Sequence, residues 1–588
     1  MSLDIARSIA VSSLMNTQVQ ISVTSSNISN ADTTGYTVKT ANQAAVVNAG
    51  TGAGTVITGI TSTVDKLLMK SLIQADSALG AADTNNDYLD QLQALYGSTA
   101  DDDSSGTSLA NTIAALETAI TSLSATSSSA ALQANVVSAL DDLATQLRDT
   151  SSGIQDLRSN ADQEIATAVD DVNEQLQTIA NLNAAIKLAA AAGQSTADLE
   201  DKRNTAVQDI ATKMNISYFI SSTGDMQVYT ASGQALVDTR AHELSFTASS
   251  TVTASSSYSA TSSSTLSGVT VNGVDVTAQI SSGEIGALIA LRDSELPAAQ
   301  AQLDQLATQL ADSLNTVSNT GTSLPPPATL TGTTAVAADT ALDATGTVRI
   351  AVADQSGTLV SYADLDLSSY ATVGDLVSAI NGISGLSASI DSDGHLTISS
   401  SSSNGVAVNE MTSSVGSDGK GLSDWLGLND LVTATGASDF AVRSDILANS
   451  GLLQVATLDS SDTLTTGSQV LSAGSATVVN ALYSALTDDI TFDAVGGLGS
   501  STGSFADYAS TIVSAVAAKA STAEDTYTAK QTAQSTFASA LASQSGVNLD
   551  EETARLSTLQ NQYSAASQLI QAINEMFSSL LQAVQSVG

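Results

Sequence analysis

The sequence predicts a multidomain α+β protein of elongated shape, with a coiled coil of terminal helices, a central bundle of long helices and inserted β-rich outer domains. Three observations lead to this prediction. A heptad repeat of apolar residues runs without a break from residue 556 to residue 587. A weaker repeat with the same period covers residues 3 to 28. Between them, the helical period gives way to strand-like alternation near Ile216 and again after Pro325.

The C-terminal segment carries the strongest of these signals. Apolar residues follow at alternating steps of three and four at Leu556, Leu559, Tyr563, Ala566, Ile570, Ile573, Phe577, Leu580, Val584 and Val587. A 3.5-residue period keeps one narrow stripe facing a partner, so we expect a helix that lies along another helix. Its other positions are mostly Ser, Gln, Asn and Ala, where a coiled coil in water would carry Glu and Lys. We therefore expect this helix to be packed on several sides.

The first 28 residues are expected to supply the partner helix. The segment from residue 3 to residue 28 contains no Pro or Gly, and Leu14, Ile21 and Ile28 repeat at intervals of seven. The companion heptad positions hold Leu3, Ala10, Thr17 and Thr24. Pairing of the first and last helices would place both termini at one end of the molecule and make the rest of the chain an insertion. The alternative is a pair of unrelated surface helices.

Helical periodicity also runs through residues 64 to 212. Its clearest seam consists of Ile165, Val169, Val172, Leu176, Ile179 and Ile186, with Asn183 at the one step that lacks an apolar residue. We expect an antiparallel helical bundle, to which residues 284–317, 477–486 and 504–543 return. The charged run 198–203 precedes another amphipathic helix and is expected to be a solvent-exposed face.

Alternating residues predict two hairpins and one separate module. Ser-Thr-Gly-Asp separates the strands 216–220 and 226–230, and Asn272-Gly273 marks a second hairpin. Residues 247–264 are mostly Ser, Thr and Ala and are expected to form a surface loop. Beyond Pro325 to Pro327, we expect strands at 347–352, 386–390 and 395–399, a helix at 373–380, and Trp425 in the core or as a lid.

These segments give four predicted domains. They are a terminal coiled-coil assembly domain (1–60 with 545–588), a helical bundle domain (61–215 with 284–321 and 441–544), a β-rich domain (216–283) and an inserted outer β-rich domain (322–440).

Composition excludes several classes of partner. The formal net charge of -41 argues against a nucleic-acid backbone as a ligand, because phosphate binding requires clustered Lys and Arg. The chain has no cysteine, so it has neither a disulfide framework nor a thiolate metal site. No apolar run approaches the ~18 residues of a membrane span, and we expect no membrane insertion. The N-terminal residues do not have the pattern of a cleaved signal peptide.

Residues suited to catalysis are scarce. The only histidines, His242 and His395, lie in predicted strand regions, where we expect surface or packing roles. Asp391 to Gly394 has the start of a calcium loop, but position twelve would be Ser402 rather than Glu, so a hairpin turn is the better interpretation. The acidic run 101–103 is expected to be a hydrated loop. We predict no enzyme activity, no catalytic residue, no cofactor and no metal.

Both chain ends resemble known proteins. Asn27-Ile28-Ser29-Asn30, followed by Gly35-Tyr36-Thr37, resembles the N-terminal signature of bacterial flagellar axial proteins, which include rod, hook and hook-associated proteins. The segment 545–552 and the heptad series that follows it resemble the C-terminus of the FlgK family, the hook-associated protein 1 of the hook–filament junction. The resemblance also covers residues 169–218 and 284–317, the helical half of the chain.

The resemblance implies a structural flagellar protein that joins the hook to the filament. It implies a ring of copies, with the hook protein, a second junction protein, flagellin and an export chaperone as partners. It also implies an extracellular location on the flagellum after type III export without a cleaved signal peptide, and folding of the chain ends coupled to assembly. The expected assembly interface comprises Leu14, Ile21, Ile28, Leu556, Leu559, Tyr563, Ile570, Ile573, Phe577, Leu580 and Val584.

Two other functions are kept as alternatives. Another axial protein of the hook or flagellin type would keep the terminal helices but form long polymers by itself. An extracellular adhesin or lytic enzyme would owe its activity to the module at residues 322–440.

Overall fold

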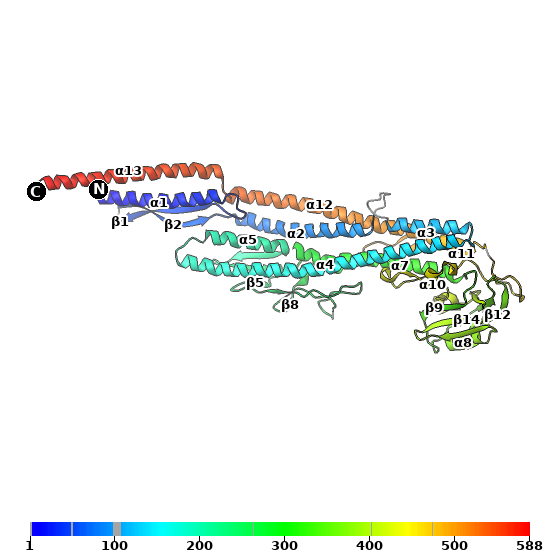
Figure 1. The fold of residues 1–588 in the computed structure, drawn as a ribbon. Coiled ribbons are helices and arrows are strands. Elements are labelled where there is room, and N and C mark those ends of the chain that lie inside the picture. Colours follow the sequence, from blue (N-terminus) through cyan, green and yellow to red (C-terminus); the bar gives the residue numbers. More distant parts are fainter. Residues whose placement is uncertain are drawn as a thin grey trace. The chain divides into compact units, whose positions relative to one another are not determined.

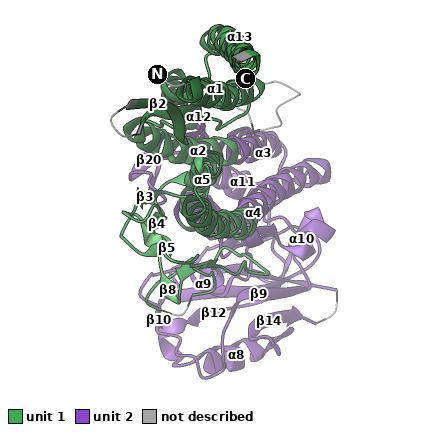
Figure 2. Ribbon diagram, turned by 90° about the vertical axis from the view of Figure 1, so that its left-hand side faces the viewer, with its two compact units in different colours: residues 1–88, 159–293, 521–588 green, residues 89–158, 294–520 purple. Residues whose placement is uncertain are grey.

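The computed structural model describes residues 3–48, 51–97, 108–262, 264–401, 403–472 and 474–587. These residues form two compact units, of which unit 1 comprises residues 1–88, 159–293 and 521–588, and unit 2 comprises residues 89–158 and 294–520 (Figure 2). Both units combine helices with small antiparallel sheets, so the predicted α+β class is confirmed. The four domain boundaries proposed from the sequence stay predictions.

The two chain ends lie together in unit 1 (Figure 1). They comprise helix α1 (Leu3–Ser29), the antiparallel strands β1 (Lys39–Asn48) and β2 (Thr51–Ser62), and helix α13 (Leu549–Val587). The glycines at positions 52 and 54 lie in β2, one of the two strands of this hairpin. Gly54 has a φ of +112°, and a Cβ there would lie 2.2 Å from Ser12 Oγ. Only glycine lets β2 approach α1 this closely.

Long helices make up most of the rest of unit 1. They are the first part of α2 (Lys66–Leu95), the later part of α4 (Ala130–Ala191), α5 (Ala197–Lys213), α6 (Gly283–Ala290) and the end of α12 (Phe505–Ser545). The predicted seam from Ile165 to Ile186 is buried along α4, which confirms its period. Asn183 is buried as well, because its side chain donates to the Met226 carbonyl (2.8 Å) and accepts from the Met226 amide (3.0 Å).

Two three-stranded sheets complete unit 1. One has the order β3-β4-β5 and the other β6-β7-β8. Their bounds are Ile216–Ile220, Met226–Thr230, Ala235–Val237, Leu244–Ser245, Thr270–Val271 and Val274–Asp275. Both predicted hairpins are confirmed. Asn272 and Gly273 have positive φ values of 52° and 77°, the conformation that tight hairpin turns require. The described residues of the stretch 247–264 form no helix or strand.

The charged run at residues 198–203 does not behave as predicted. It lies within the first turns of α5, and two of its side chains, Asp201 and Arg203, are buried. Lys39 of β1 pairs with Asp201, and one guanidinium nitrogen of Arg203 donates to Asn183 Oδ1 and to the Gly224 carbonyl (both 2.8 Å). The prediction of a solvent-exposed face is wrong for Asp201 and Arg203, because their partners come from distant parts of the chain.

A second buried charge lies where α6 ends. The chain passes through a π-helical turn (Leu291–Glu295), from which Arg292 enters the interior with a fully buried side chain. Its guanidinium group donates to Asp162 Oδ1 (2.7 Å), to the Ser267 carbonyl (3.1 Å) and to both carboxylate oxygens of Asp293 (2.8 Å each). Asp162 is also buried. The predicted helix over residues 284–317 is thus present, with this interruption.

The helices of unit 2 pack around α11 (Thr477–Thr487), which contacts α3 (Leu109–Ser124) and α7 (Leu296–Asn319). The start of α4 and the start of α12 also belong to this unit. A short hairpin joins α11 to α12 and consists of β19 (Ile490–Phe492) and β20 (Ser501–Gly503).

The predicted β-rich module is present in unit 2. Its two sheets have the orders β12-β11-β15 and β13-β14-β9, with α8 packed against β13. The main elements are β9 (Thr329–Ala335), β11 (Thr347–Ala353), β12 (Leu359–Asp366), α8 (Val373–Asn381), β13 (Leu386–Ile390), β14 (His395–Ser400) and β15 (Gly405–Asn409). Shorter elements are β10 (Ala344–Thr345), β16 (Ser414–Val415), α9 (Leu422–Leu426), β17 (Val432–Thr433), β18 (Ala441–Val442) and α10 (Ser444–Ala448).

The predicted strands at 347–352, 386–390 and 395–399 and the helix at 373–380 are all confirmed, and Trp425 packs against the module core. Leu458 and Leu471 also pack with Ala351 of β11, so residues beyond 440 contribute to this region.

Glu410 should make the stability of unit 2 depend on pH. Its Oε1 accepts the Asp424 amide (2.9 Å), but burial and the nearby Asp424 charge raise its pKa to about 6. The folded state then binds this proton more tightly than the unfolded state, so stability falls as pH rises from about 4.5 to about 6. In the native protein this fall amounts to roughly 1 kcal/mol of the free energy of unfolding, and we expect Glu410→Gln to abolish it. Urea unfolding across this range measures it, and identical pH profiles for both proteins would contradict the assignment.

Candidate assembly interface

Helices α1 and α13 lie side by side within unit 1 and run antiparallel (Figure 1). Asn27 near the end of α1 is hydrogen-bonded to Glu552 near the start of α13. The two termini therefore lie at the same end of this pair, as the heptad pattern predicted. In the same view, α13 continues past the described start of α1.

Both helices bury residues at a spacing of seven. On α1, the buried positions Ala10, Thr17 and Thr24 are seven residues apart. On α13, the same spacing separates the buried residues Leu559, Ala566 and Ile573. Thr17 satisfies its hydroxyl by donating to the Ser13 carbonyl (2.8 Å) of its own helix. The stripe on α1 consists of small residues, and the one on α13 combines Ala566 with the larger Leu559 and Ile573.

The structure places the predicted interface residues in three environments. Leu559 and Ile573 are buried against α1. Half-buried positions along the pair are Leu14, Ile21, Ile28, Leu556, Ile570 and Phe577. The exposed ones are Tyr563, Leu580 and Val584. Only part of the predicted set is therefore brought together within one copy of the chain, and the side chain of Val587 lies outside the described residues.

Five exposed apolar residues lie in the C-terminal half of α13. Leu580 and Val584 continue the seam beyond α1, with exposed fractions of 54% and 65%, and Leu581 beside them is 57% exposed. Leu569 and Met576 flank the seam and are also about half exposed. We call these five residues the α13 patch. Singly exposed apolar residues are ordinary, but several on one helix end indicate a surface that another chain covers.

A buried polar cluster fixes the junction of α1 with the hairpin and with α13. Asn27 is fully buried at its centre. Its amide nitrogen donates to the Lys39 carbonyl (2.9 Å) and to Glu552 Oε2 (3.0 Å), and its Oδ1 accepts from the Lys39 amide and the Tyr36 hydroxyl (3.0 Å each). All four hydrogen bonds available to the Asn27 side chain are made. We call Asn27, Tyr36, Lys39, Asp201 and Glu552 the Asn27 cluster.

Lys39 extends the cluster to α5. Its ammonium group is buried, pairs with Asp201 and lies 4.2 Å from the centroid of the Tyr36 ring. Asp201 also accepts hydrogen bonds from the Thr37 amide (3.0 Å) and hydroxyl (2.7 Å). Burial raises the pKa of Tyr36, and the nearby carboxylates of Asp198, Asp201 and Glu552 add to this shift. The phenol therefore stays neutral and acts as a donor.

The Asn27 cluster explains the sequence motif at residues 27–37. Asn27 and Tyr36 are the motif residues whose side chains meet, and Thr37 binds Asp201. The predicted assembly interface does not include these residues, because its members were chosen as large apolar residues at heptad spacing. The available signal was an Asn in the last turn of the predicted helix, close to a turn, which suits an amide that bonds backbone groups of the returning chain.

The two histidines and the predicted turn at Asp391 lie next to carboxylates or backbone amides of the fold. His242 Nε2 lies 3.1 Å from Asp238, and His395 Nδ1 lies 3.6 Å from Asp391. Asp391 Oδ1 accepts the Asp393 and His395 amides (2.9 and 2.8 Å), which confirms the predicted turn. Residues 101–103 lie outside the described residues. Within the described ranges, no three His, Asp or Glu side chains are grouped to hold a metal ion, and no helix has the length and apolarity of a membrane span.

Four protein-family models match the chain. The flagella basal body rod protein model matches residues 8–37, and the C-terminal model of the rod proteins FlgEFG matches residues 539–583. The helical domain of the flagellar hook-associated protein FlgK matches residues 89–329, and the flagellin hook IN motif matches residues 347–402. No individual curated protein matches the chain.

The chain is also similar to a solved structure over most of the length of both proteins. The flagellar hook junction protein FlgK from Burkholderia pseudomallei is 15% identical, with a TM-score of 0.48 over 80% of this chain and 98% of that protein.

The paired terminal helices, together with rod-protein matches at both ends, define a structural protein of the bacterial flagellum. The match over residues 89–329 then narrows the class. This part of the chain matches the helical domain of the FlgK family of flagellar hook-associated proteins. The alternatives of a hook or flagellin-type protein and of an adhesin or lytic enzyme are not favoured by these matches.

Proposed function

We propose that this protein joins the flagellar hook to the filament, as a ring of copies that assemble through their terminal helices. The observation that carries this proposal is the α13 patch. Two of its residues, Leu580 and Val584, continue the seam of the terminal helices beyond the length that α1 covers. A neighbouring copy that packs against Leu580 and Val584 would bury this surface by a heterologous contact, which closes into a ring when the rotation allows it.

The proposal includes the partners on each side of the ring and the location of the assembly. The hook protein lies on one side, and a second junction protein and flagellin lie on the other. An export chaperone binds the chain before secretion, and the assembled ring is extracellular after export without a cleaved signal peptide. Uncharged Ser and Gln on the remaining faces of α13 suit contacts with several neighbours, since charged side chains would be desolvated there at high cost.

Charge substitution in the α13 patch tests the proposal. Leu580→Asp with Val584→Asp should leave the isolated protein folded, because both side chains are exposed, but should prevent attachment of filaments to hooks. The matched control is Leu188→Asp, since Leu188 is 77% exposed on α4 and lies outside the terminal helices. Microscopy of cells that carry each variant, together with circular dichroism of the purified proteins, gives the readout.

Deletion of residues 556–588 should have the same effect on attachment and also leave the remaining domains folded. Normal filament attachment by the double aspartate variant would contradict the proposal. Long polymers of the purified protein without hooks would favour the alternative of a hook or flagellin-type protein.

A further inference from the structure

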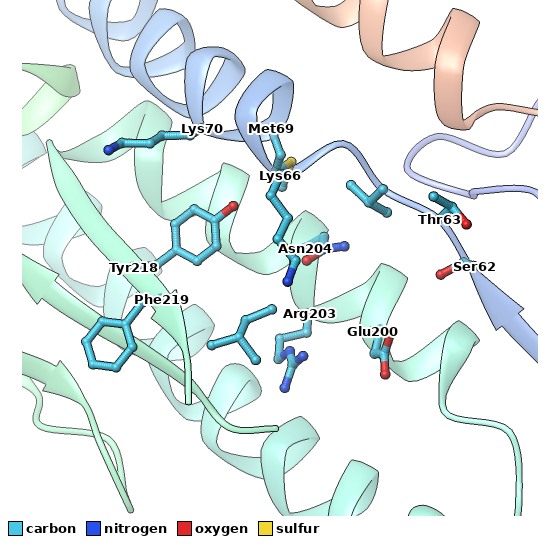
Figure 3. A pocket seen from close by; sticks show the side chains of 12 residues that line it. Ser62, Thr63, Lys66, Met69, Lys70, Glu200, Arg203, Asn204, Tyr218 and Phe219 are labelled. Atoms are coloured by element: carbon cyan, nitrogen blue, oxygen red, sulfur yellow. The ribbon is translucent and has the colours of Figure 1, made fainter. Parts of the chain in front are cut away.

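A hollow of about 570 Å³ lies in unit 1 between three segments of the chain. Its lining comes from the end of β2 and the start of α2, from α5, and from β3 (Figure 3). We call it the β3 cleft and define it by the lining residues Lys66, Lys70, Arg203, Tyr218 and Ile220. None of these residues belongs to the Asn27 cluster or to the α13 patch.

Positive charge is concentrated in this cleft. The chain has only 18 Lys and Arg residues against 59 Asp and Glu residues, yet three of the cations and a single carboxylate, Glu200, line the cleft. Lys66 and Lys70 are exposed on α2, and neither forms an ion pair within the described residues. Arg203 is buried, bonds only uncharged oxygens through its hydrogen bonds, and its Nε has no hydrogen-bond partner. An anionic group in the cleft would therefore meet a net positive charge, since three cations and one carboxylate line it.

The cleft also contains an open sheet edge. β3 is the outer strand of its sheet and pairs only with β4. Ser221 donates to the Asp225 carbonyl opposite it, so the alternation of an antiparallel ladder directs the backbone groups of Tyr218 and Ile220 away from β4. Such an edge is a template for a further strand.

Apolar surface lies beside this edge. Ile220 is 41% exposed, and Phe219 on the same strand is 51% exposed and stacks on Tyr229 with a centroid separation of 5.5 Å. Figure 3 shows the Tyr218 ring on the side of Lys66 and Lys70, and the Phe219 ring directed away from them. The edge thus combines unpaired backbone groups, apolar side chains and two free ammonium groups.

We propose that the β3 cleft is a docking site for an extended acidic segment of a partner protein, which adds as a strand to β3 with its carboxylates facing Lys66 and Lys70. The backbone of the segment completes the ladder at Tyr218 and Ile220, and its apolar side chains cover the exposed surface of β3. Charge complementarity selects an acidic segment over a basic one. This inference does not rest on the assembly proposed above.

Binding of a defined peptide to the full-length protein tests the proposal. The probe is a fluorescein-labelled peptide of alternating Glu and Val, and the control probe has Lys in place of Glu. We expect saturable binding of the acidic peptide alone, as measured by fluorescence anisotropy. Lys66→Glu with Lys70→Glu should weaken it by roughly tenfold, and raising salt from about 50 to 500 mM should weaken it as well.

Two further variants distinguish the contributions to peptide binding. One tests whether binding requires the charges of the cleft itself rather than the net charge of the protein, and the other tests whether it requires the backbone of the strand edge. Lys202→Glu on the exposed side of α5 carries the same kind of charge change outside the cleft lining and should leave binding unchanged. Ile220→Pro removes an amide of the free edge and should weaken binding without changing the lysines. Circular dichroism confirms that each variant is folded.

Several results would overturn the proposal. Equal binding of the Lys peptide, or no effect of the double charge reversal, would remove the cleft as an acidic-peptide site. Competition by free glutamate as effective as by unlabelled peptide would indicate a simple anion site. A reversible dimer that the double charge reversal dissociates would make a second copy of this chain the occupant instead.

Discussion

Asn27→Leu is expected to lower the free energy of unfolding of the terminal region by about 3–5 kcal/mol, since several buried polar groups lose their partners together. Leucine has a similar volume but forms none of the four hydrogen bonds that the Asn27 side chain makes. The Lys39 amide and carbonyl, the Tyr36 hydroxyl and Glu552 Oε2 then lose the hydrogen bonds that Asn27 made to them. Hydrogen exchange resolved by segment should show faster exchange in α1, β1 and the start of α13.

The matched control for Asn27 comes from the same motif. Ser29 is exposed at the end of α1, and Ser29→Ala should change stability by less than about 0.5 kcal/mol. Because the predicted loss occurs at the junction of α1, the hairpin and α13, it should also prevent filament attachment. Unchanged exchange in α13 after Asn27→Leu would show that the Asn27 cluster does not hold this helix.

Arg292→Met should destabilise unit 1 by about 3–5 kcal/mol, because it leaves the Asp162 carboxylate buried without its cationic partner. The side chains of both residues are almost completely inaccessible to solvent. Chemical unfolding followed by circular dichroism measures the loss. The exposed Arg240 lies in the same unit, and Arg240→Met should change stability by less than about 0.5 kcal/mol.

A second variant distinguishes the ion pair from the packing of the arginine. Adding Asp162→Asn to Arg292→Met removes the unpaired charge but keeps an acceptor for the Ser249 amide, which donates to Asp162 (2.6 Å). We expect this double variant to recover a large part of the lost stability. If it is no more stable than Arg292→Met alone, the loss comes from the packing of Arg292 and its other hydrogen bonds.

The local sequence pattern was sufficient to predict structure where the conformation of a segment depends mainly on its own residues. The seam from Ile165 to Ile186 predicted a helix face that is buried in α4, and Asn272-Gly273 predicted a turn that has the required positive φ values. The small residues at heptad positions of α1 also indicated its contact stripe. Missed strands such as β12 and β15 lack clear alternation, because their burial depends on neighbours in the sheet rather than on one apolar face.

Charged and polar residues were the least predictable, since their environment depends on partners far along the chain. Asp201 is separated from Lys39 by more than one hundred residues, and Glu552 from Asn27 by more than five hundred. From residue type alone, charged side chains such as these are expected to be exposed, because burying an unpaired charge is costly. The fold offsets this cost by bringing the partners together. The periodicity of a single segment contains no information about such distant partners.

The sequence by itself predicted that the first and last helices pair, that both chain ends resemble flagellar axial proteins, and that the module after Pro325 is β-rich. A 3.5-residue repeat predicts the helix pairing because it records which face of a helix is apolar. Only the tertiary structure decided how far α1 covers α13, and therefore that Leu580 and Val584 remain exposed. The extent of that cover is set by where the Asn27 cluster holds the two helices in register, and hydrophobic period carries no information about that offset.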